Sequence, residues 1–279
     1  MKERKLTEET LMQFRQHLEA EEKSPATVEK YVRDVARFGD FAGEEKVTKE
    51  TVIAWKRKLQ EEDYAPTSIN SMLASLNSLL KFLGWQTCRV RSLRIQRQTY
   101  LCPEKELNRD EYLQLLKAAE GRPQLKLVME TICGTGIRVS ELSHFTVEAA
   151  SRGEVRIQCK GKMRTILIPA KLRKLLLRFA RQNRIATGII FQTRSGRPVN
   201  RSNIWAQMKN LCEEAGVSPS KVFPHNLRKL FARAFYRQEK DIAQLADVLG
   251  HSSINTTRIY IMSSGTEHRR KIDRLGLVV

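Results

Sequence analysis

Apolar residues recur every three or four positions through the first third of the chain. The first such stripe contains Leu11, Phe14 and Leu18. Three further stripes follow helix-start signals, in which a capping residue or a first-turn proline precedes the apolar positions. These signals are Ser24-Pro25, Thr48 and Pro66-Thr67. The stripes are typical of helices packed in a bundle, so the pattern predicts four helices between residues 6 and 84.

A second helical region begins at Asn108, where Glu111 three residues later predicts a capping box. The helical period then returns repeatedly, and the predicted helices cover 125–132, 170–183, 202–214, 225–237, 241–249 and a short stretch around Tyr260. Between 155 and 168 the apolar residues instead alternate with polar ones on both sides of Lys160-Gly161-Lys162. Alternation around a short turn is typical of a β-hairpin. The predicted fold class is mainly α with a small antiparallel β-sheet.

The region between the two helical parts is basic. Gly84 closes the bundle, and no acidic residue occurs from Gln86 to Pro103, a stretch that holds four arginines: Arg89, Arg91, Arg94 and Arg97. We interpret 87–105 as a linker between a domain at 1–86 and a domain at 106–279. A solvated basic loop is the alternative, but four arginines here would favour the approach of a linker to a negatively charged partner.

Charge narrows the class of partner. The 279 residues include 50 Lys and Arg against 31 Asp and Glu, which gives a net charge of +19. Such an excess indicates a polyanionic partner, and nucleic acid is favoured over a membrane because neither end carries a strongly amphipathic basic helix. No apolar run is long enough for a transmembrane helix, and the N-terminus lacks the apolar core of a signal peptide. Five dispersed cysteines are typical of reduced thiols, so we expect a cytoplasmic protein.

Candidate chemistry is concentrated near the C-terminus. His225 and Arg228 are three residues apart, so one helix can present both on one face. His251, in the sequence Leu-Gly-His, follows 23 residues after Arg228, and Tyr260 follows nine residues later. A tyrosine that attacks a phosphodiester needs cations to neutralise the phosphate oxygens and a group that handles the leaving-group proton. Two imidazoles, a guanidinium and a phenol are suited to that reaction.

A further motif lies upstream, at Gly134-Thr135-Gly136-Ile137-Arg138-Val139-Ser140-Glu141-Leu142. Together with His-x-x-Arg, Leu-Gly-His and the tyrosine, it resembles the signature of the tyrosine recombinases, or phage integrases. The resemblance extends from about residue 7 to Tyr260 and is nearest to Xer-type recombinases and integrases of mobile elements. It implies an N-terminal helical core-binding (SAM-like) domain and a C-terminal catalytic domain that close around duplex DNA.

The resemblance also implies a role for each matching residue. Tyr260 would be the nucleophile, Arg138 and Arg228 would clamp the scissile phosphate, and Lys160 would be the general acid. His225 would assist proton transfer and contact the phosphate, and His251 would hydrogen-bond to it. Glu141 would support the site, although a simple surface ion pair with Arg138 is an alternative. Lys162 stays open as an alternative to Lys160.

Other positively charged residues are expected to contact the DNA backbone: Arg89, Arg91, Arg94, Arg97, Lys162 and Arg164. A metal site is the competing interpretation of the two histidines, but no carboxylate or cysteine lies at ligand spacing beside either one. The resemblance implies covalent chemistry that requires no metal, ATP or other cofactor.

The implied reaction proceeds through a 3′-phosphotyrosyl intermediate and a Holliday junction in a homotetramer on double-stranded DNA recombination sites. Apolar residues after Tyr260 (Ile272, Leu275, Leu277 and Val278) indicate a tail that docks on a neighbouring protomer, although folding back on its own core is the alternative. A relaxing enzyme similar to type IB topoisomerases and a DNA-binding regulator without catalysis are the competing functions. The target sequence, the accessory DNA-bending proteins and the choice among integration, excision, inversion and resolution stay open.

Overall fold

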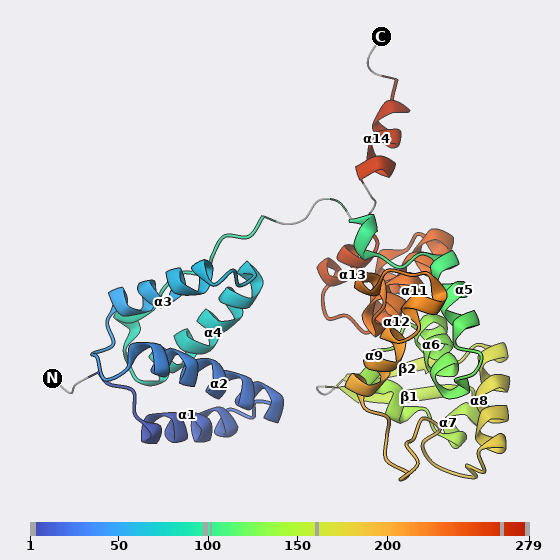
Figure 1. Ribbon diagram of the computed structural model, residues 1–279, viewed down its shortest axis with the longest axis horizontal. Coiled ribbons are helices and arrows are strands. Elements are labelled where there is room, and N and C mark those ends of the chain that lie inside the picture. Colours follow the sequence, from blue (N-terminus) through green and yellow to red (C-terminus); the bar gives the residue numbers. More distant parts are fainter. Residues whose placement is uncertain (1–3, 97–99, 101, 160–161, 263–264, 277–279) are drawn as a thin grey trace. The chain divides into compact units, whose positions relative to one another are not determined.

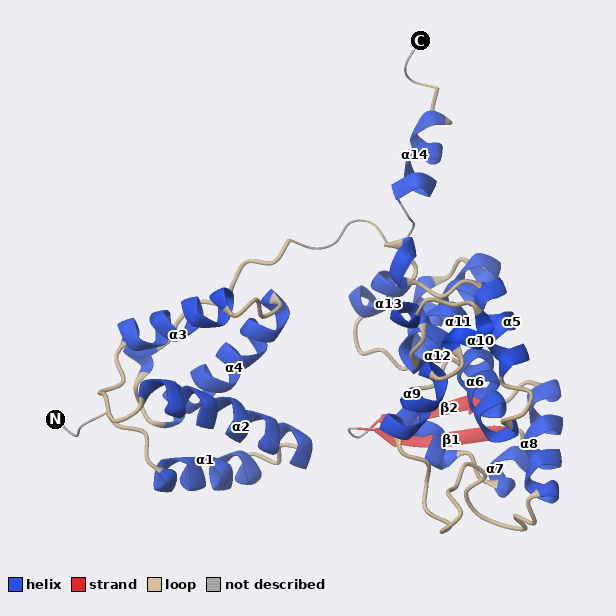
Figure 2. Ribbon diagram, in the orientation of Figure 1, coloured by secondary structure: helices blue, strands red, loops and turns tan. Residues whose placement is uncertain are grey.

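The structure is a computed structural model that describes residues 4–96, 100, 102–159, 162–262 and 265–276. The chain divides into two compact units, Met1–Arg97 and Gln98–Val279 (Figures 1 and 2). Helices dominate both units, and the strands described lie in the second. Among the described residues, no helix is both long enough and apolar enough to cross a membrane.

The N-terminal unit contains the four predicted helices: α1 (Glu8–Ala20), α2 (Pro25–Ala42), α3 (Lys49–Glu61) and α4 (Pro66–Phe82). Ser24 caps α2, and Thr48 caps α3 in a capping box, as their positions before the apolar stripes predicted. The helices enclose an apolar core in which Phe38 meets the edge of Trp55, with ring centroids 5.2 Å apart. The first third of the chain is therefore a helical bundle with its own core.

The chain stays attached to this bundle well after α4 ends. A short 3₁₀ turn, η1 (Gln86–Cys88), places Cys88 in the core. Two asparagines of α4 then hold the following backbone: Asn77 exchanges hydrogen bonds with Val90, and Asn70 does so with Leu93. The division after Arg97 thus falls inside the segment that the sequence assigned to a linker.

The second unit is mainly helical. Its helices are α5 (Arg109–Ala118), α6 (Pro123–Thr135), α7 (Val147–Arg152), α8 (Ala170–Gln182), α9 (Arg201–Lys209), α10 (Cys212–Ala215), α11 (Pro224–Glu239), α12 (Ile242–Leu249), α13 (Ile254–Tyr260) and α14 (Gly265–Asp273). Short 3₁₀ turns are η2 (Pro103–Lys105), η3 (Val139–His144) and η4 (Pro219–Lys221). The capping box of Asn108 and Glu111 opens α5 as predicted. The predicted helix at 202–214 is interrupted, so it forms α9 and α10.

The predicted hairpin is present. Strands β1 (Glu154–Cys159) and β2 (Lys162–Leu167) pair antiparallel, with Val155 opposite Ile166 and Cys159 opposite Lys162. Val155, Ile157 and Ile166 are buried, because alternate residues of a strand face the same side. The hairpin therefore anchors one face in the core of the unit.

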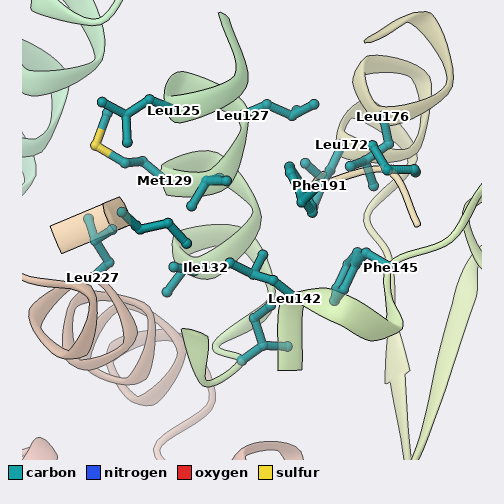
Figure 3. Close-up of a cluster of buried hydrophobic side chains, with 14 of the residues drawn as sticks. Leu125, Leu127, Met129, Ile132, Leu142, Phe145, Leu172, Leu176, Phe191 and Leu227 are labelled. Atoms are coloured by element: carbon teal, nitrogen blue, oxygen red, sulfur yellow. The ribbon is translucent and has the colours of Figure 1, made fainter. Parts of the chain in front are cut away.

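Helix α6 lies at the centre of the second unit and packs against α8, α9 and α11. Leu125, Met129 and Ile132 of this helix contribute to a buried cluster, together with Leu172 of α8 and Leu227 of α11 (Figure 3). Packing on both sides fixes α6, and the functional motif at Arg138 begins just beyond its C-terminal end. The core of the unit thus supports the candidate site directly.

Candidate active site

The first arginine of the site follows a tight turn at the end of α6. Gly136 ends the helix in the left-handed region, with φ of 65°, a conformation that side chains disfavour. A Cβ at this position would also lie 2.3 Å from the ring of Phe231 in α11. The turn therefore requires glycine, and it brings the carbonyl of Gly136 and the side chain of Arg138 close to α11.

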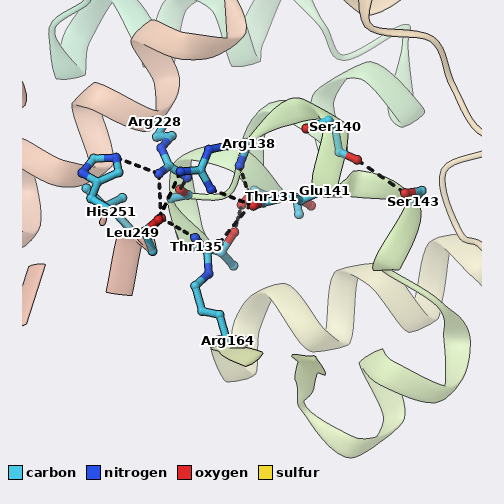
Figure 4. A network of polar contacts seen from close by, with 12 residues as sticks. Thr131, Thr135, Arg138, Ser140, Glu141, Ser143, Arg164, Arg228, Leu249 and His251 are labelled. Carbon is cyan, nitrogen blue, oxygen red and sulfur yellow. Dashed lines mark hydrogen bonds and ion pairs between the residues drawn. The ribbon is translucent and has the colours of Figure 1, made fainter. Parts of the chain in front are cut away.

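Arg138 and Glu141 form the first part of the polar network (Figure 4). The carboxylate of Glu141 accepts a hydrogen bond from the backbone N–H of Arg138 at 2.7 Å and another from its Nη1 at 3.0 Å. Nη2 of Arg138 donates to the carbonyl of Gly250 at 3.2 Å. Because Arg138 is held at both ends of its guanidinium but stays partly exposed, it can present its remaining N–H groups to an anion.

Arg228 is the most buried charge of the site, with 1% of its surface exposed. Its Nη1 donates to the carbonyl of Gly136 at 2.6 Å, and its Nη2 donates to that of Leu249 at 2.7 Å. Burial, followed by the nearby charge of Arg138, lowers its pKa to about 10, so the guanidinium is still protonated at neutral pH. These two carbonyls hold a rigid cation at the centre of the site.

His251 completes the arrangement around Arg228. Nη2 of Arg228 lies 3.0 Å from Nε2 of His251, and Nδ1 of the same ring lies 2.8 Å from Oγ1 of Thr257. A guanidinium can only donate, so Nε2 is an acceptor and Nδ1 carries the proton. Burial and the adjacent Arg228 lower the pKa of His251 to about 4. The imidazole is therefore neutral at physiological pH, before any phosphate is bound.

Arg164 has a different place from the one that its sequence position suggested. Its Nη2 lies 3.0 Å from a carboxylate oxygen of Glu141, and its Nη1 donates to the carbonyl of Leu249. A side chain expected on the DNA-facing surface is instead mostly buried within the catalytic unit, where it links the hairpin to Glu141 and α12 (Figure 4). Arg164 therefore supports the two other arginines of the site.

Gly250 leaves room for the guanidinium of Arg164 to approach the end of α12. It has φ of 64° after α12, and a Cβ there would lie 2.5 Å from Nη1 of Arg164. Its own carbonyl accepts from Arg138. In the Leu-Gly-His motif the glycine is thus required by both the backbone conformation and the adjacent guanidinium.

Tyr260 lies between the two histidines. Its ring centroid is 5.1 Å from that of His225 and 5.0 Å from that of His251, and both imidazoles stand edge-on to it. The tyrosine is 7% exposed, and its proximity raises the pKa of Arg228 against the stronger effect of burial. The structure therefore brings together Arg138, His225, Arg228, His251 and Tyr260, which are spread over 123 positions of the sequence.

His225 begins the catalytic face of α11. It follows Pro224 in the first turn of that helix, as its position after a proline predicted. Removal of water from around the ring, together with Lys229 and Arg228, lowers the pKa of His225, while Glu106 opposes the shift. A neutral imidazole beside the phenol can accept a proton from it.

A cleft of about 680 Å³ opens beside these groups. Arg138, His225 and Arg228 line one part of it, while Arg201 and Trp205 of α9 line another. Sequence reasoning gave no role to these two α9 residues. Trp205 is about half exposed in the structure, but single exposed aromatic residues are common, so the sequence held no signal that marked it.

Two lysines of the predicted site are not placed by the structure. Lys160 lies outside the described residues, and the side chain of Lys162 does as well. Within the described part of the chain, no group of three or more His, Cys, Asp or Glu side chains is arranged to hold a metal ion. The described site is thus built from arginines, imidazoles, one carboxylate and one phenol.

Comparison with known proteins identifies the family. The model of the phage integrase family matches residues 105–267, and that of the phage integrase N-terminal SAM-like domain matches residues 11–87. The tyrosine recombinase XerA of Pyrococcus furiosus is 27% identical over 288 residues, which cover 100% of this chain and 98% of that protein. Tyrosine recombinase XerH of Campylobacter jejuni is 34% identical over 141 residues, 48% of this chain and 40% of that protein.

Solved structures share the fold. A lambda integrase dimer bound to a core site matches with a TM-score of 0.75 and 18% identity, covering 93% of this chain and 96% of that one. XerH bound to its difH substrate matches with a TM-score of 0.69 and 18% identity, covering 88% and 78%. The chain therefore belongs to the phage integrase family of site-specific tyrosine recombinases, enzymes that break and rejoin DNA.

Proposed function

We propose that this enzyme recombines specific DNA sites through covalent attachment of Tyr260 to the DNA. The phenolic oxygen attacks the scissile phosphorus, the bond from phosphorus to the 5′ oxygen breaks, and that oxygen leaves with a proton as a free 5′ hydroxyl. The packing of Tyr260 between His225 and His251, next to the buried Arg228, carries this proposal. The energy of the phosphodiester is kept in the 3′-phosphotyrosyl bond, so rejoining needs no ATP.

The arginines stabilise the charge that develops on phosphate. Arg138 lies just before η3 and Arg228 lies on α11, and both are oriented by backbone carbonyls. Fixed donors of this kind stabilise a transition state without rearranging, and one such donor contributes about 10²- to 10³-fold to a rate. Glu141 acts indirectly, because it fixes Arg138 and Arg164.

The two histidines have separate roles. His225 takes the phenolic proton, which its neutral form and its edge-on contact with the tyrosine support. His251 donates a hydrogen bond to the phosphate. That role requires the imidazole to change its present hydrogen bonds, because Nε2 now accepts from Arg228 and the Nδ1 proton is directed at Thr257.

The general acid for the departing 5′ oxygen is Lys160, by resemblance to the family's hairpin lysine. Lys162 is the alternative, and substitution of each by alanine distinguishes them. A DNA strand whose leaving oxygen is replaced by sulfur needs no general acid, because a thiolate is a good leaving group. Such a substrate should rescue cleavage by the variant that lacks the true acid, and the other lysine variant should gain nothing from it.

Further basic residues bind the DNA backbone. Arg89, Arg91 and Arg94 are exposed on the segment that follows α4, and Arg97 lies outside the described residues. Each phosphate contact steepens the salt dependence of binding. Alanine substitution of Arg91 and Arg94 should therefore weaken binding on all DNA sequences alike, and more strongly at low salt.

The assembly that we propose is supported by a structure of the same fold. A lambda integrase structure of the same fold is a tetramer on a Holliday junction, matching with a TM-score of 0.75 at 18% identity over 92% of this chain and 77% of that one. We propose that four copies of this protein act on two DNA sites and exchange the strands in two steps. Because the substrate is DNA, we expect the enzyme to act in the cytoplasm.

The C-terminal tail holds the tetramer together in this proposal. Ile272 and Leu275 are exposed in the structure, and the neighbouring Leu277 and Val278 lie outside the described residues. Deletion of residues 268–279 should abolish tetramers on DNA while a single site is still bound. Tetramers that form normally without the tail would contradict its role.

A suicide DNA substrate tests the function as a whole. A nick placed next to the cleavage site lets a short strand diffuse away after attack, so the protein stays covalently bound. Wild-type protein should form the adduct, and Tyr260→Phe should form none while retaining the same fold and DNA affinity. An adduct with Tyr260→Phe would exclude this tyrosine as the nucleophile. Relaxation of supercoiled DNA by a monomer, with no joining of two sites, would instead favour the topoisomerase function.

A further inference from the structure

Helix α11 carries two polar stripes that are offset by one residue. His225 and Arg228, three residues apart, face the catalytic site. Asn226, Lys229 and Arg233 follow the spacing i, i+3, i+7 and therefore share a neighbouring face of the helix. Because successive residues of a helix differ by about 100°, the partners of the second stripe determine where the first one points.

The second stripe binds the segment that leads into the catalytic unit. Nδ2 of Asn226 donates to the carbonyl of Lys105 at 2.7 Å, and Nη2 of Arg233 donates to that of Leu107 at 2.6 Å. Nδ2 of Asn226 also donates to the carbonyl of Lys221 at 2.8 Å. The bonds to Lys105 and Leu107 join α11 to backbone more than 100 residues earlier in the chain.

Glu106 lies at the centre of these contacts. Nζ of Lys229 is 2.6 Å from its Oε1, and Nη1 of Arg233 donates to its Oε2. The residue is 9% exposed, and Leu107 beside it is completely buried. One mostly buried carboxylate thus binds two cations on the same helix face, one turn and two turns after His225.

We propose that Glu106 is a positioning residue for strand cleavage: by binding Lys229 and Arg233 it fixes the rotation of α11, and with it the aim of His225 and Arg228. The inference rests on the proposed function of those two residues. It adds a group outside the catalytic motifs, supplied by the entry segment of the unit. Glu106 itself does not touch the reacting atoms.

The same carboxylate also acts on His225 through its charge. The groups that influence this imidazole are Arg228 and Lys229 on its own helix, Arg201 of α9 and Glu106, and the rings of Tyr260 and His251 lie nearby. Lys229 lowers the pKa of His225, whereas Glu106 raises it. Loss of Glu106 should therefore move that pKa down, and loss of Lys229 should move it up.

The experiment compares Glu106→Gln, Lys229→Met and a matched control, Glu111→Gln, in the full-length protein. Glu111 pairs with Lys221 at 2.6 Å and is similarly shielded from solvent, but it does not bind α11. Single-turnover cleavage of the suicide substrate at saturating protein should fall at least about tenfold in Glu106→Gln. Lys229→Met should lose less, since Arg233 remains, and Glu111→Gln should match the wild type.

The titration of His225, followed by NMR in the protein without DNA, supplies a readout that loosened packing alone would not give. Its pKa should move in opposite directions in Glu106→Gln and Lys229→Met. Glu106→Gln that cleaves like Glu111→Gln, or shifts of His225 in the same direction, would overturn the proposal.

The experiment distinguishes failure of the proposed function from failure of the positioning role of Glu106. If wild-type protein forms no adduct, the proposed function fails, and the NMR titration still decides whether Glu106 and Lys229 control His225. If Glu106→Gln does not fold, Lys229→Met carries the test: an unchanged cleavage rate together with an unchanged pKa of His225 would refute the positioning role.

Discussion

The two units of this protein place charge differently. The N-terminal bundle fills its core with apolar side chains, and among its described residues the strongly buried carboxylate is Asp34, which is bound by Lys30 and Ser75. The catalytic unit buries Arg228 completely and shields most of Glu141 and Arg164 at the centre of its site. Burial of charge costs free energy unless each group is paired and hydrogen-bonded. In the catalytic unit the buried Arg228 and Glu141 lie where we propose that the phosphate binds, whereas Asp34 of the bundle is buried away from any proposed site.

The strongest test of the difference between the two units is substitution of Arg228, the most buried charge of the site. Arg228→Met keeps an unbranched apolar stem but removes the donors to Gly136, Leu249 and His251. Cleavage of the suicide substrate should fall at least about 10²- to 10³-fold. The thermal midpoint should also fall, because the carbonyl of Gly136 loses this partner and the carbonyl of Leu249 keeps only Arg164 among the described side-chain donors. Arg33→Met, on an exposed face of the bundle, is the surface control and should keep the cleavage rate at saturating protein.

Gly250→Ala tests how tightly the site is packed. The new methyl group would meet the guanidinium of Arg164, so we expect the cleavage rate to fall roughly tenfold or more. The left-handed backbone of the alanine should also lower the free energy of unfolding by about 1 kcal/mol. Gly216→Ala is the matched control, because Gly216 has φ of 63° but open space around its Cα. It should lose a similar amount of stability and keep full cleavage. Equal cleavage by the two variants would mean that Arg164 moves away at no cost.

Leu76→Ala tests the apolar unit in the same way. Leu76 is fully buried in the bundle, and truncation there should lower the free energy of unfolding by about 2–5 kcal/mol. Below the unfolding temperature, the cleavage rate at saturating protein should stay near that of the wild type, since no catalytic group is displaced. Denaturant unfolding and single-turnover cleavage measure the two quantities. A large loss of cleavage at full folding would show that the bundle does more than hold DNA.

The smallest expected effect is a pH dependence of stability. The pKa of His251 is lowered from 6.5 to about 4 in the folded protein, so the unfolded chain binds the proton more readily between these values. The contribution of His251 is therefore complete above about pH 6.5 and is lost as the pH falls toward 4. His251→Gln should flatten the decline in the free energy of unfolding between pH 6.5 and 5, measured without DNA. An unchanged slope would exclude a neutral, partly buried imidazole at this position.

Local patterns in the sequence were sufficient for much of the architecture. Proline, threonine and asparagine at helix starts, together with apolar stripes, predicted the bundle and the opening of α5, since capping and periodicity act within a few residues. Alternation predicted the hairpin for the same reason. The motifs around Arg138, Arg228 and Tyr260 were found as well, because each requires a particular residue type at a short spacing.

Only the tertiary structure decided which side chains meet. Arg164 was predicted to contact DNA, yet its guanidinium is held by Glu141, because the hairpin packs beside η3 and α12. Neither Trp205 nor Glu106 carried a motif, since the cleft beside Trp205 and the cations that bind Glu106 are formed by other elements. The sequence by itself determined the helices, the hairpin and which reactive side chains are present. Packing between elements that are far apart in the chain determined how those side chains are oriented, because the spacing of residues along one helix does not specify which other elements face that helix.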